Sequence, residues 1–237
     1  MTETKHALVA GASSDIGRAI AADLASLGFS VSLWGRDRDR LEATAAQCRA
    51  AGPAAWVDTV DLTDGAGLRR AVGGLPARGP LTVVAYVAGV FDWAPAHEAD
   101  GERWRQLLDV NLTSAAVLTT LVLPTLVERA PSALVYIGSG AARRAYPGNA
   151  AYVASKHGLA GFARAVFLDV RALGVKVSLV NAGMVAAGAS LASPAGRDRP
   201  ETLLRPEDVA AAVRFVVTMP PHACVPELEL QPQLPPG

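Results

Sequence analysis

The sequence predicts an α/β fold: a single domain over residues 1–237, built on an open, doubly wound, seven-stranded parallel sheet with helices on both faces. Short apolar runs alternate with longer helical stretches along the whole chain, and this strand–helix–strand order is typical of parallel sheets. The runs are apolar throughout, as expected for strands that are covered on both faces. Right-handed crossovers between such strands produce the doubly wound topology.

Each predicted element follows from the alternation of these runs. The seven predicted strands lie at residues 6–10, 30–34, 54–60, 81–88, 133–138, 176–181 and 225–230. The six predicted helices lie at residues 16–27, 38–50, 63–73, 98–128, 150–173 and 206–218. Pro206 and the acidic residues Glu207 and Asp208 suit the first turn of the last helix, where a missing N–H costs nothing and negative charge opposes the helix dipole.

Two segments fall outside this pattern. Residues 184–205 show no clear periodicity, and the Pro-rich residues 231–237 are expected to form a flexible tail.

The composition excludes several classes of function. Hydrophobic residues make up 51% of the chain and charged residues 19%, which suits a compact core. The 22 basic and 22 acidic residues balance, so no bulk attraction to nucleic acid or to a membrane surface is expected. No signal peptide is expected, because the apolar run at residues 6–10 is too short, and without a run of about twenty apolar residues no membrane span is predicted. The widely separated Cys48 and Cys224 form neither a disulfide framework nor a metal-ligand spacing, which indicates a cytoplasmic protein.

The first predicted strand leads into a turn of small residues between Gly11 and Gly17, followed by a helix. Small residues let backbone N–H groups approach a pyrophosphate, and the helix N-terminus favours its negative charge. The turn therefore predicts a dinucleotide site. The turn residues expected to contact the cofactor are Gly11, Ser13, Ser14, Asp15, Ile16 and Gly17.

The end of the second predicted strand indicates which dinucleotide is bound. Gly35 stands where an NAD-preferring fold carries an acidic residue, about twenty positions past the glycines. Arg36 follows, and its guanidinium suits a 2′-phosphate. We therefore predict NADPH/NADP⁺ rather than NADH. The alternative is that Arg36 only belongs to a surface turn with Arg38 and Arg40, and the acidic Asp37 weakens the distinction.

Tyr152 and Lys156 are the most informative pair in the chain. They stand four residues apart in an Ala-rich segment that predicts a helix, so they share one helix face. The ammonium group is expected to lower the pKa of the phenol from its usual value of about 10. Tyr152 is then suited to exchange a proton with a substrate oxygen near neutral pH. Ser139 ends the fifth predicted strand, at the edge where open α/β sheets bind ligands.

Together these motifs resemble the short-chain dehydrogenase/reductase family, over nearly the whole chain, and the resemblance implies a Rossmann-type fold. The family carries T-G-x-x-x-G-x-G after the first strand, where this chain has Ala10 for the Thr and Asp15 for the middle Gly. We expect Asp15 to fit by bonding local backbone and adopting unusual φ/ψ angles. Three further departures are Tyr86-Val87-Ala88-Gly89 in place of N-N-A-G, Ala182 in place of a Pro, and Ala187 in place of a Thr.

The resemblance implies roles for four residues. Tyr152 gives its proton to the carbonyl oxygen in reduction, or takes it in oxidation. Lys156 lowers the pKa of that phenol and hydrogen-bonds the nicotinamide ribose. Ser139 orients and polarises the carbonyl, and Asn111 helps to hold a water that relays protons to Lys156.

The resemblance also implies further cofactor contacts. Asp61 would touch the adenine amino group, although it could instead be the cap of the following helix. The other implied contacts are Leu62, Ala88, Gly89, Tyr152, Lys156, Ala182, Gly183 and Val185.

The substrate is less well defined by the sequence. Residues 184–205 are expected to form a lid, and Phe91, Trp93 and Met184 are candidate walls of the substrate pocket. Phe91 and Trp93 could equally be core residues. Arg143 and Arg144 either meet an anionic or carrier-bound substrate or form a solvated loop, and the loop is favoured.

The leading hypothesis is an NADPH-dependent ketoreductase for a small to medium carbonyl compound, such as a β-ketoacyl or polyketide-like one. The alternatives are the same fold catalysing alcohol oxidation, epimerisation or dehydration, and a non-catalytic NADP(H)-sensing protein. The helices at 98–128 and 150–173 are those that such enzymes use to build homodimers and homotetramers. No metal site is predicted.

Overall fold

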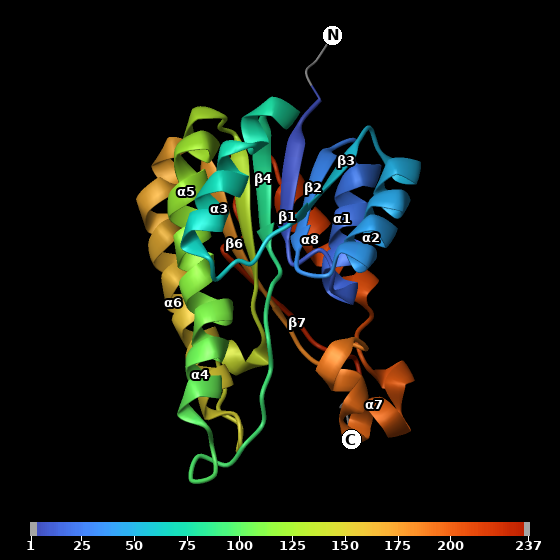
Figure 1. Ribbon diagram of the computed structural model, residues 1–237, viewed down its shortest axis with the longest axis vertical. Helices are drawn as coiled ribbons and strands as arrows, with labels where there is room; N and C mark the ends of the chain where they lie inside the picture. Colours follow the sequence, from blue (N-terminus) through green and yellow to red (C-terminus); the bar gives the residue numbers. More distant parts are fainter. Residues whose placement is uncertain (1–3, 235–237) are drawn as a thin grey trace.

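Seven parallel strands form one sheet in the order β3-β2-β1-β4-β5-β6-β7 (Figure 1). The structure is a computed structural model, and it describes residues 4–234. All seven predicted strands are present, each within a few residues of its expected bounds. They are β1 His6–Ala10, β2 Ser30–Gly35, β3 Ala55–Thr59, β4 Leu81–Tyr86, β5 Ser132–Ile137, β6 Val175–Ala182 and β7 Glu227–Leu230.

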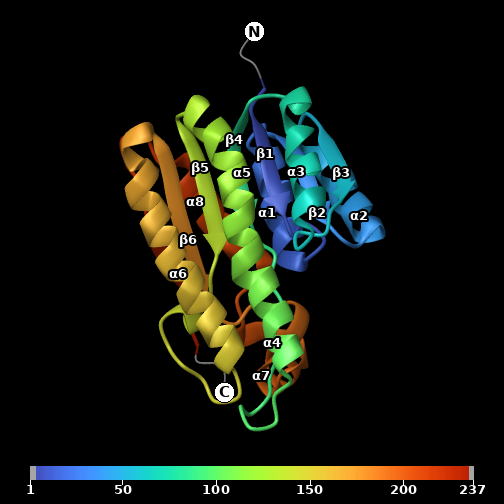
Figure 2. The same cartoon turned by 60° about the vertical axis from the view of Figure 1, so that its left-hand side comes forward.

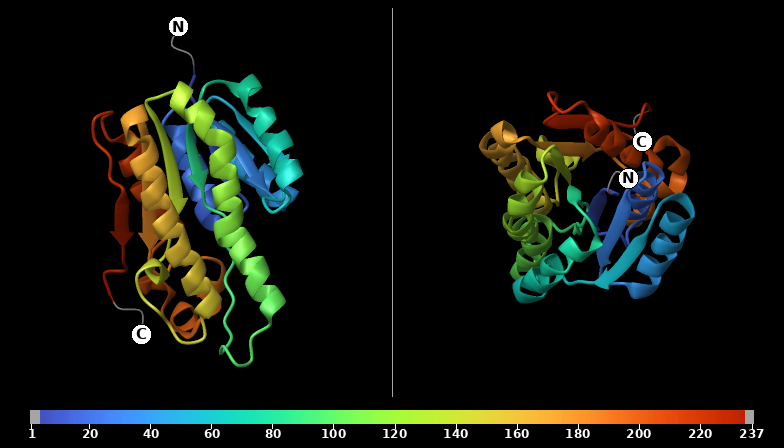
Figure 3. Two further views of the ribbon diagram at one scale, coloured as in Figure 1. Left: turned by 90° about the vertical axis from the view of Figure 1, so that its left-hand side faces the viewer. Right: turned by 90° about the horizontal axis from the view of Figure 1, so that it is seen from above.

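Helices cover both faces of this sheet, which confirms the doubly wound, Rossmann-type fold. One face carries α1 (Asp15–Ser26), α2 (Arg38–Ala51) and α8 (Pro206–Thr218). The other carries α3 (Gly65–Gly73), α4 (Gly101–Leu108), α5 (Ser114–Glu128) and α6 (Ala150–Val170). Figure 3 shows the sheet enclosed between these two groups of helices when the molecule is seen from above.

Each face of the sheet has its own hydrophobic core. In β1, Ala7 and Val9 pack into the core under α1 and α8, while Leu8 and Ala10 pack into the core under α5 and α6. Successive side chains of a strand point to opposite faces, so a strand that is covered on both faces is apolar at most positions. This is why the apolar runs of the sequence located the strands.

The helix predicted at 98–128 is the one element that the structure divides. It begins at Gly101, and a π-helical turn, Asp109–Thr113, separates α4 from α5. The backbone N–H of Ser114 donates to the carbonyl of Asp109, which widens the helix at Asn111. Figure 2 shows this long helix lying beside α6, so the widened turn faces the helix that carries Tyr152 and Lys156.

The continuous helical stretch Gly101–Glu128 is long and apolar enough to span a membrane by length and composition alone, with a mean hydropathy of 1.7 in its most apolar window. However, Leu118, Val122 and Leu126 of this stretch belong to the core beneath the sheet. Those contacts identify it as a core helix of this fold.

The strand order reverses between β1 and β4, and ligands bind at the carboxyl ends of strands at such a point. Three short helical segments lie at the same end, Gly188–Ala192, α7 (Pro194–Asp198) and Pro200–Thr202. They fall inside the predicted lid, residues 184–205. Residues 231–234 of the predicted tail also reach this end, and residues 235–237 lie outside the described residues.

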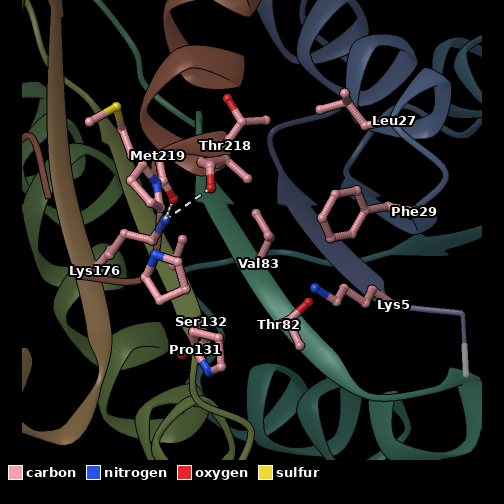
Figure 4. A pocket seen from close by; sticks show the side chains of 14 residues that line it. Lys5, Leu27, Phe29, Thr82, Val83, Pro131, Ser132, Lys176, Thr218 and Met219 are labelled. Atoms are coloured by element: carbon pink, nitrogen blue, oxygen red, sulfur yellow. Dashed lines mark hydrogen bonds between the residues drawn. The ribbon is translucent and has the colours of Figure 1, made fainter. Parts of the chain in front are cut away.

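A pocket lies at the other end of the sheet, where the strands begin (Figure 4). Its buried Lys176 donates hydrogen bonds to the carbonyls of Val217 and Met219 at the end of α8. The lysine therefore caps a helix C-terminus, where the dipole favours positive charge.

Candidate active site

The turn between β1 and α1 is held by one serine and two glycines. The Ser14 hydroxyl accepts a hydrogen bond from Gly17 N at 3.0 Å and donates one to Gly11 O at 2.8 Å, which caps α1. Gly11 has φ 102°, and a Cβ there would lie 2.5 Å from the backbone nitrogen of Ala88. A Cβ at Gly17 would overlap the Gly11 carbonyl. Only glycine fits either position, so the turn can lie directly against the end of β4.

Asp15 fits into this turn in a different way from the one predicted. It is the first residue of α1, and only glycines have positive φ among the described residues. Its carboxylate pairs with two side chains, Arg18 at 3.3 Å and Arg40 at 3.1 Å. The expectation of unusual φ/ψ angles and local backbone bonds was therefore wrong. A helix N-terminus and two guanidinium groups stabilise the carboxylate instead.

The turn forms one side of a small cleft of about 130 Å³ that brings together residues from four strand ends. Eight of the predicted cofactor contacts line it: Gly11, Ser13, Ser14, Arg36, Asp61, Leu62, Ala88 and Gly89. Of the remaining ones, Asp15 and Gly17 lie in the first turn of α1, and Tyr152 and Lys156 lie on α6. Ile16, Ala182, Gly183 and Val185 line the neighbouring cavity that contains Tyr152.

Arg36 differs from its basic neighbours in having no partner. Arg38 pairs with Glu42 at 3.5 Å and Arg40 with Asp15, whereas Arg36 forms no ion pair within residues 4–234 and lies exposed at the cleft. The carboxylate of Asp37 accepts a hydrogen bond from Arg40 N at 3.0 Å and caps α2. The Asp37 carboxylate is thus engaged at a helix end, and the guanidinium of Arg36 is available to a ligand.

Asp61 lies opposite Arg36 in the cleft. Its carboxylate accepts hydrogen bonds from the backbone and hydroxyl of Thr63, at 2.9 and 2.7 Å, and these bonds, together with the charge of Arg36, lower its pKa. The cap of α3 is Asp64, which accepts from Ala66 N at 3.0 Å. The alternative reading of Asp61 as a helix cap is therefore wrong, because Asp64, three residues further on, occupies that position.

Ser139 and Tyr152 line a single larger cavity of about 490 Å³. Ser139 follows β5, and its hydroxyl oxygen accepts a hydrogen bond from Ala141 N at 3.1 Å. One acceptor position is thereby occupied, and the O–H remains able to donate into the cavity. Phe91 and Met184, both predicted pocket residues, also line this cavity.

Lys156 lies behind Tyr152 on the same face of α6. Its side chain is buried, and its ammonium group donates to the carbonyl of Ile137 at 3.1 Å and lies 5.7 Å from the centre of the Tyr152 ring. Burial lowers the pKa of Lys156 to about 8. The group can therefore change its charge near neutral pH.

The pKa of Tyr152 moves opposite to the predicted direction. Burial raises it above its usual value, and interaction with the Ser139 hydroxyl only partly offsets the rise. The expectation of a lowered pKa was wrong for the protein alone, because the cost of burying a phenolate dominates the shift. The phenol is consequently protonated at neutral pH, in the form that donates a proton.

Asn111 lies in the π-helical turn and forms a clamp. Its side-chain oxygen accepts a hydrogen bond from Val90 N at 2.8 Å, and its amide donates to Val90 O at 2.9 Å and to Ser155 Oγ at 3.1 Å. The clamp fixes the segment after Gly89 against α6. The poor helix former in the middle of a predicted helix thus marks a specialised turn, as π-turns often do at functional sites.

Tyr86 replaces the first missing asparagine of N-N-A-G. It is buried, and its hydroxyl lies 2.6 Å from both the Val110 carbonyl and Ser114 Oγ. It therefore links the end of β4 to the π-helical turn. Sequence reasoning noted the absence of the asparagines but not this replacement, because a Tyr in an apolar strand gives no signal of its partner.

The structure does not place Trp93 in the cavity. Its side chain is 63% exposed and its indole lies against Gly148, where a Cβ would collide with it. The prediction of Trp93 as a pocket wall was therefore wrong, since the loop after Phe91 turns outward. Further walls that the sequence did not reveal include Tyr146 and Gln231, which come from a loop and from the segment after β7.

A buried polar group supports the loop that carries Ser139. Asn181, at the end of β6, accepts a hydrogen bond from Ser139 N at 3.2 Å and donates to Glu227 at 2.7 Å. Glu227 in turn pairs with Arg143 and Arg164, each at 2.9 Å. The solvated-loop reading of Arg143 was therefore incomplete, because this guanidinium is tied to β7.

Comparison with known proteins agrees with this geometry. Residues 5–197 match the sequence model of the short chain dehydrogenase family. The chain belongs to this family. It is therefore an oxidoreductase of the class that interconverts hydroxyl and carbonyl groups.

Individual relatives extend the match over almost the whole chain. The chain is 32% identical to sulfoacetaldehyde reductase 2 of Chromohalobacter salexigens, over 95% of this chain and 93% of that protein. It is similar in structure to a metagenomic short-chain oxidoreductase in complex with NADP, with 30% identity, a TM-score of 0.85 and 98% of each chain covered. It is also similar to a variant of the actinorhodin polyketide ketoreductase with NADPH, with 27% identity, a TM-score of 0.88 and coverage of 96% and 95%.

Proposed function

We propose that this chain reduces a ketone or aldehyde to the alcohol with NADPH, and that Tyr152 donates the proton. One observation carries the proposal: the hydroxyls of Ser139 and Tyr152 line the same cavity, and the Lys156 ammonium is buried directly behind the phenol. This is the arrangement that proton transfer to a carbonyl oxygen requires.

The cofactor is NADP(H), as in the two solved relatives described above. The cleft beside the β1–α1 turn fits this group. Gly11 and Gly17 have no side chains, so the backbone of the turn is open to a ligand. The start of α1 offers backbone N–H groups to a pyrophosphate. Arg36 offers a guanidinium without an ion-pair partner among the described residues. The residues proposed to hold the cofactor are Gly11, Ser13, Ser14, Asp15, Ile16, Gly17, Arg36, Asp61, Leu62, Ala88, Gly89, Tyr152, Lys156, Ala182, Gly183 and Val185.

The side chains divide the chemistry among them. NADPH, when bound, supplies the hydride. The Ser139 hydroxyl donates a hydrogen bond to the carbonyl oxygen, which orients and polarises it. Tyr152 gives its proton to the same oxygen, and the Lys156 charge stabilises the phenolate that forms. Asn111 keeps the segment after Gly89 in place, and the predicted water relay to Lys156 remains part of the proposal.

A panel of carbonyl compounds with NADPH, run beside the matching alcohols with NADP⁺, tests the direction of the reaction. Ketone reduction at neutral pH supports a reductase, because a Tyr152 phenol with a raised pKa is already protonated. Turnover of alcohols alone would favour the dehydrogenase alternative. Nucleotide binding without turnover of either panel would favour the sensor alternative, as would a cellular role that is unchanged by Tyr152→Phe.

Assembly, location and the lid are also proposals. Apolar side chains on two helices are exposed, including Leu168 at 64% on α6 and Phe215 at 50% on α8. They support a homodimer or homotetramer. The two free cysteines, Cys48 and Cys224, support a cytoplasmic location. We retain residues 184–205 as a lid because Met184, Ala187 and Ser190 line the cavity.

A further inference from the structure

We propose that the cavity beside Tyr152 takes a carbonyl compound without negative charge, and that this chain discriminates against carboxylate and sulfonate substrates. This proposal rests on the proposed carbonyl reduction by NADPH, and it specifies the class of substrate that the same site accepts.

The first support is the cavity wall. No lysine, arginine or histidine lines the cavity within the described part of the chain. Its polar side chains are neutral: Ser139, Asn149, Tyr152, Ser190 and Gln231, together with Tyr146. The rest of the wall is apolar or backbone. A carboxylate desolvated here would have no counterion, which costs several kcal/mol for a buried ion.

The second support is the state of Arg143. Arg143 follows the Ser139 loop, where it could have bound an anion, but its Nε pairs with Glu227 at 2.9 Å and a terminal nitrogen lies 3.5 Å from Glu229. Burial alone would raise the pKa of Glu227, but hydrogen bonds from Arg143 and Arg164 bring it below its usual value. Glu227 is therefore ionised at neutral pH, and Arg143 is neutralised.

The third support is the position of Glu229. Gln231 lines the cavity, and its amide nitrogen donates to Glu229 at 2.9 Å. A carboxylate thus lies directly behind this part of the wall, with 32% of its side chain exposed. Because this carboxylate is itself paired with Arg143, the two charges offset each other, and an anionic substrate group near Gln231 would find no free counterion there.

Lys156 does not change this balance. Its ammonium is buried, donates to the Ile137 carbonyl and lies behind the Tyr152 ring rather than in the wall.

Two aromatic rings form part of the cavity wall. Phe91 packs edge-on against Tyr152, with ring centres 5.0 Å apart, and is 48% exposed, and Tyr146 is 46% exposed. Exposed rings of this kind favour an alkyl or aryl group on the substrate.

The inference separates this chain from one of its relatives. Sulfoacetaldehyde reductase 2 is named for an aldehyde that carries a sulfonate. Overall similarity would assign an anionic substrate to this chain as well. The uncharged cavity wall and the paired Arg143 instead favour a neutral substrate.

Matched pairs of ketones that differ only in charge test the inference. Suitable pairs are ethyl 3-oxobutanoate with 3-oxobutanoate, and methyl 4-acetylbenzoate with 4-acetylbenzoate. We expect kcat/KM with NADPH to be roughly 100-fold higher for each ester than for its acid. Equal or higher values for the acids would overturn the inference and leave the proposed reductase intact. No reduction of any member, despite NADPH binding, would contradict the proposed function, and the inference would fall with it.

A charge added to the wall gives the converse test. Ala189 is an exposed lid residue that lines the cavity, so Ala189→Arg places a cation there with little risk to folding, and Ala189→Gln is the neutral control of similar length. The acid-to-ester ratio of kcat/KM should rise about tenfold in Ala189→Arg relative to Ala189→Gln, and the gain should shrink in high salt. An equal ratio in the two variants would show that charge does not govern selection at this wall.

Discussion

Burial shifts the pKa values of Tyr152 and Lys156 in opposite directions, and both shifts suit reduction. A phenol with a raised pKa holds its proton until a carbonyl oxygen takes it, and an amine with a pKa near 8 is still charged at neutral pH. The sequence located these residues, since helical spacing alone places them on one face. It could not give the direction of the Tyr152 shift, because burial depends on Phe91 and on the rest of the cavity wall.

The Lys156 shift predicts how activity depends on pH. Reduction should slow as pH rises through about 8, because Lys156 then loses the charge that stabilises the phenolate. The pH profile of kcat/KM, which reports groups of the free enzyme, checks this. Lys156→Arg is the control, since a guanidinium stays charged and should remove the inflection near pH 8. A profile of the native enzyme that stays flat through this region would contradict the assignment.

Arg36 provides a second prediction for a single residue. Arg36→Ala should weaken NADPH binding by roughly 10- to 100-fold through the loss of charged hydrogen bonds to the 2′-phosphate, and should leave NADH nearly unchanged. Arg38→Ala is a matched control, because Arg38 is exposed nearby but pairs with Glu42. Titration of both nucleotides measures the effect. Equal losses for NADPH and NADH would show that Arg36 does not contact the phosphate.

At the level of elements, the π-helical turn is the feature that the sequence could indicate only indirectly. Helix propensity predicted one continuous helix over 98–128, and an Asn in its middle was the single sign of irregularity. The turn depends on contacts between distant segments, in which Asn111 clamps Val90 and Tyr86 bonds the Val110 carbonyl. Local sequence does not encode such contacts. Strand positions, in contrast, follow directly from apolar runs.

Tyr86→Phe tests the link between β4 and this turn. Removing the hydroxyl leaves a buried carbonyl with one partner fewer, so the free energy of unfolding should fall by about 1–3 kcal/mol. Activity should fall as well, because the turn positions Asn111. Tyr136→Phe is the control: that buried hydroxyl lies 2.6 Å from Thr119 Oγ1 on α5, so its loss should cost stability but not activity. Unfolding curves and kcat/KM separate the two effects, and equal activity losses would argue against a specific role for Tyr86.

For the whole molecule, the two-faced core explains why the fold class could be predicted so fully. Covered parallel strands favour apolar residues at most positions, and seven such runs define the sheet before any contact is known. The site was predictable where short motifs carry it, as at Gly11, Ser139 and Tyr152. It was not predictable where the loop after Phe91 carries Trp93 away from the cavity, or where the segment after β7 brings Gln231 to it.

The fold also makes a prediction about acid stability. His6 on β1 is buried with its Nε2 2.9 Å from Ser32 Oγ, and burial, together with the charge of Arg78, lowers its pKa to about 4. In the unfolded chain His6 takes up a proton near pH 6.5, whereas in the folded protein it does so only near pH 4. Stability should therefore fall by up to about 3 kcal/mol as pH drops through this window and then level off.

Denaturant unfolding between these pH values measures the loss. His6→Gln should flatten the dependence, whereas His97→Gln should not, because the His97 side chain is 80% exposed. Identical slopes in the two variants would mean that another group carries the acid sensitivity.

The most direct measurement is a comparison of Tyr152→Phe with the native enzyme in a single turnover of bound NADPH with a neutral ketone. Only a hydroxyl is removed, so nucleotide affinity should stay within about threefold, while hydride transfer should slow by roughly 10²–10⁴ because the carbonyl oxygen loses its proton donor. A variant that binds NADPH normally and still transfers hydride at a rate close to the native one would contradict the assignment of Tyr152 as the acid.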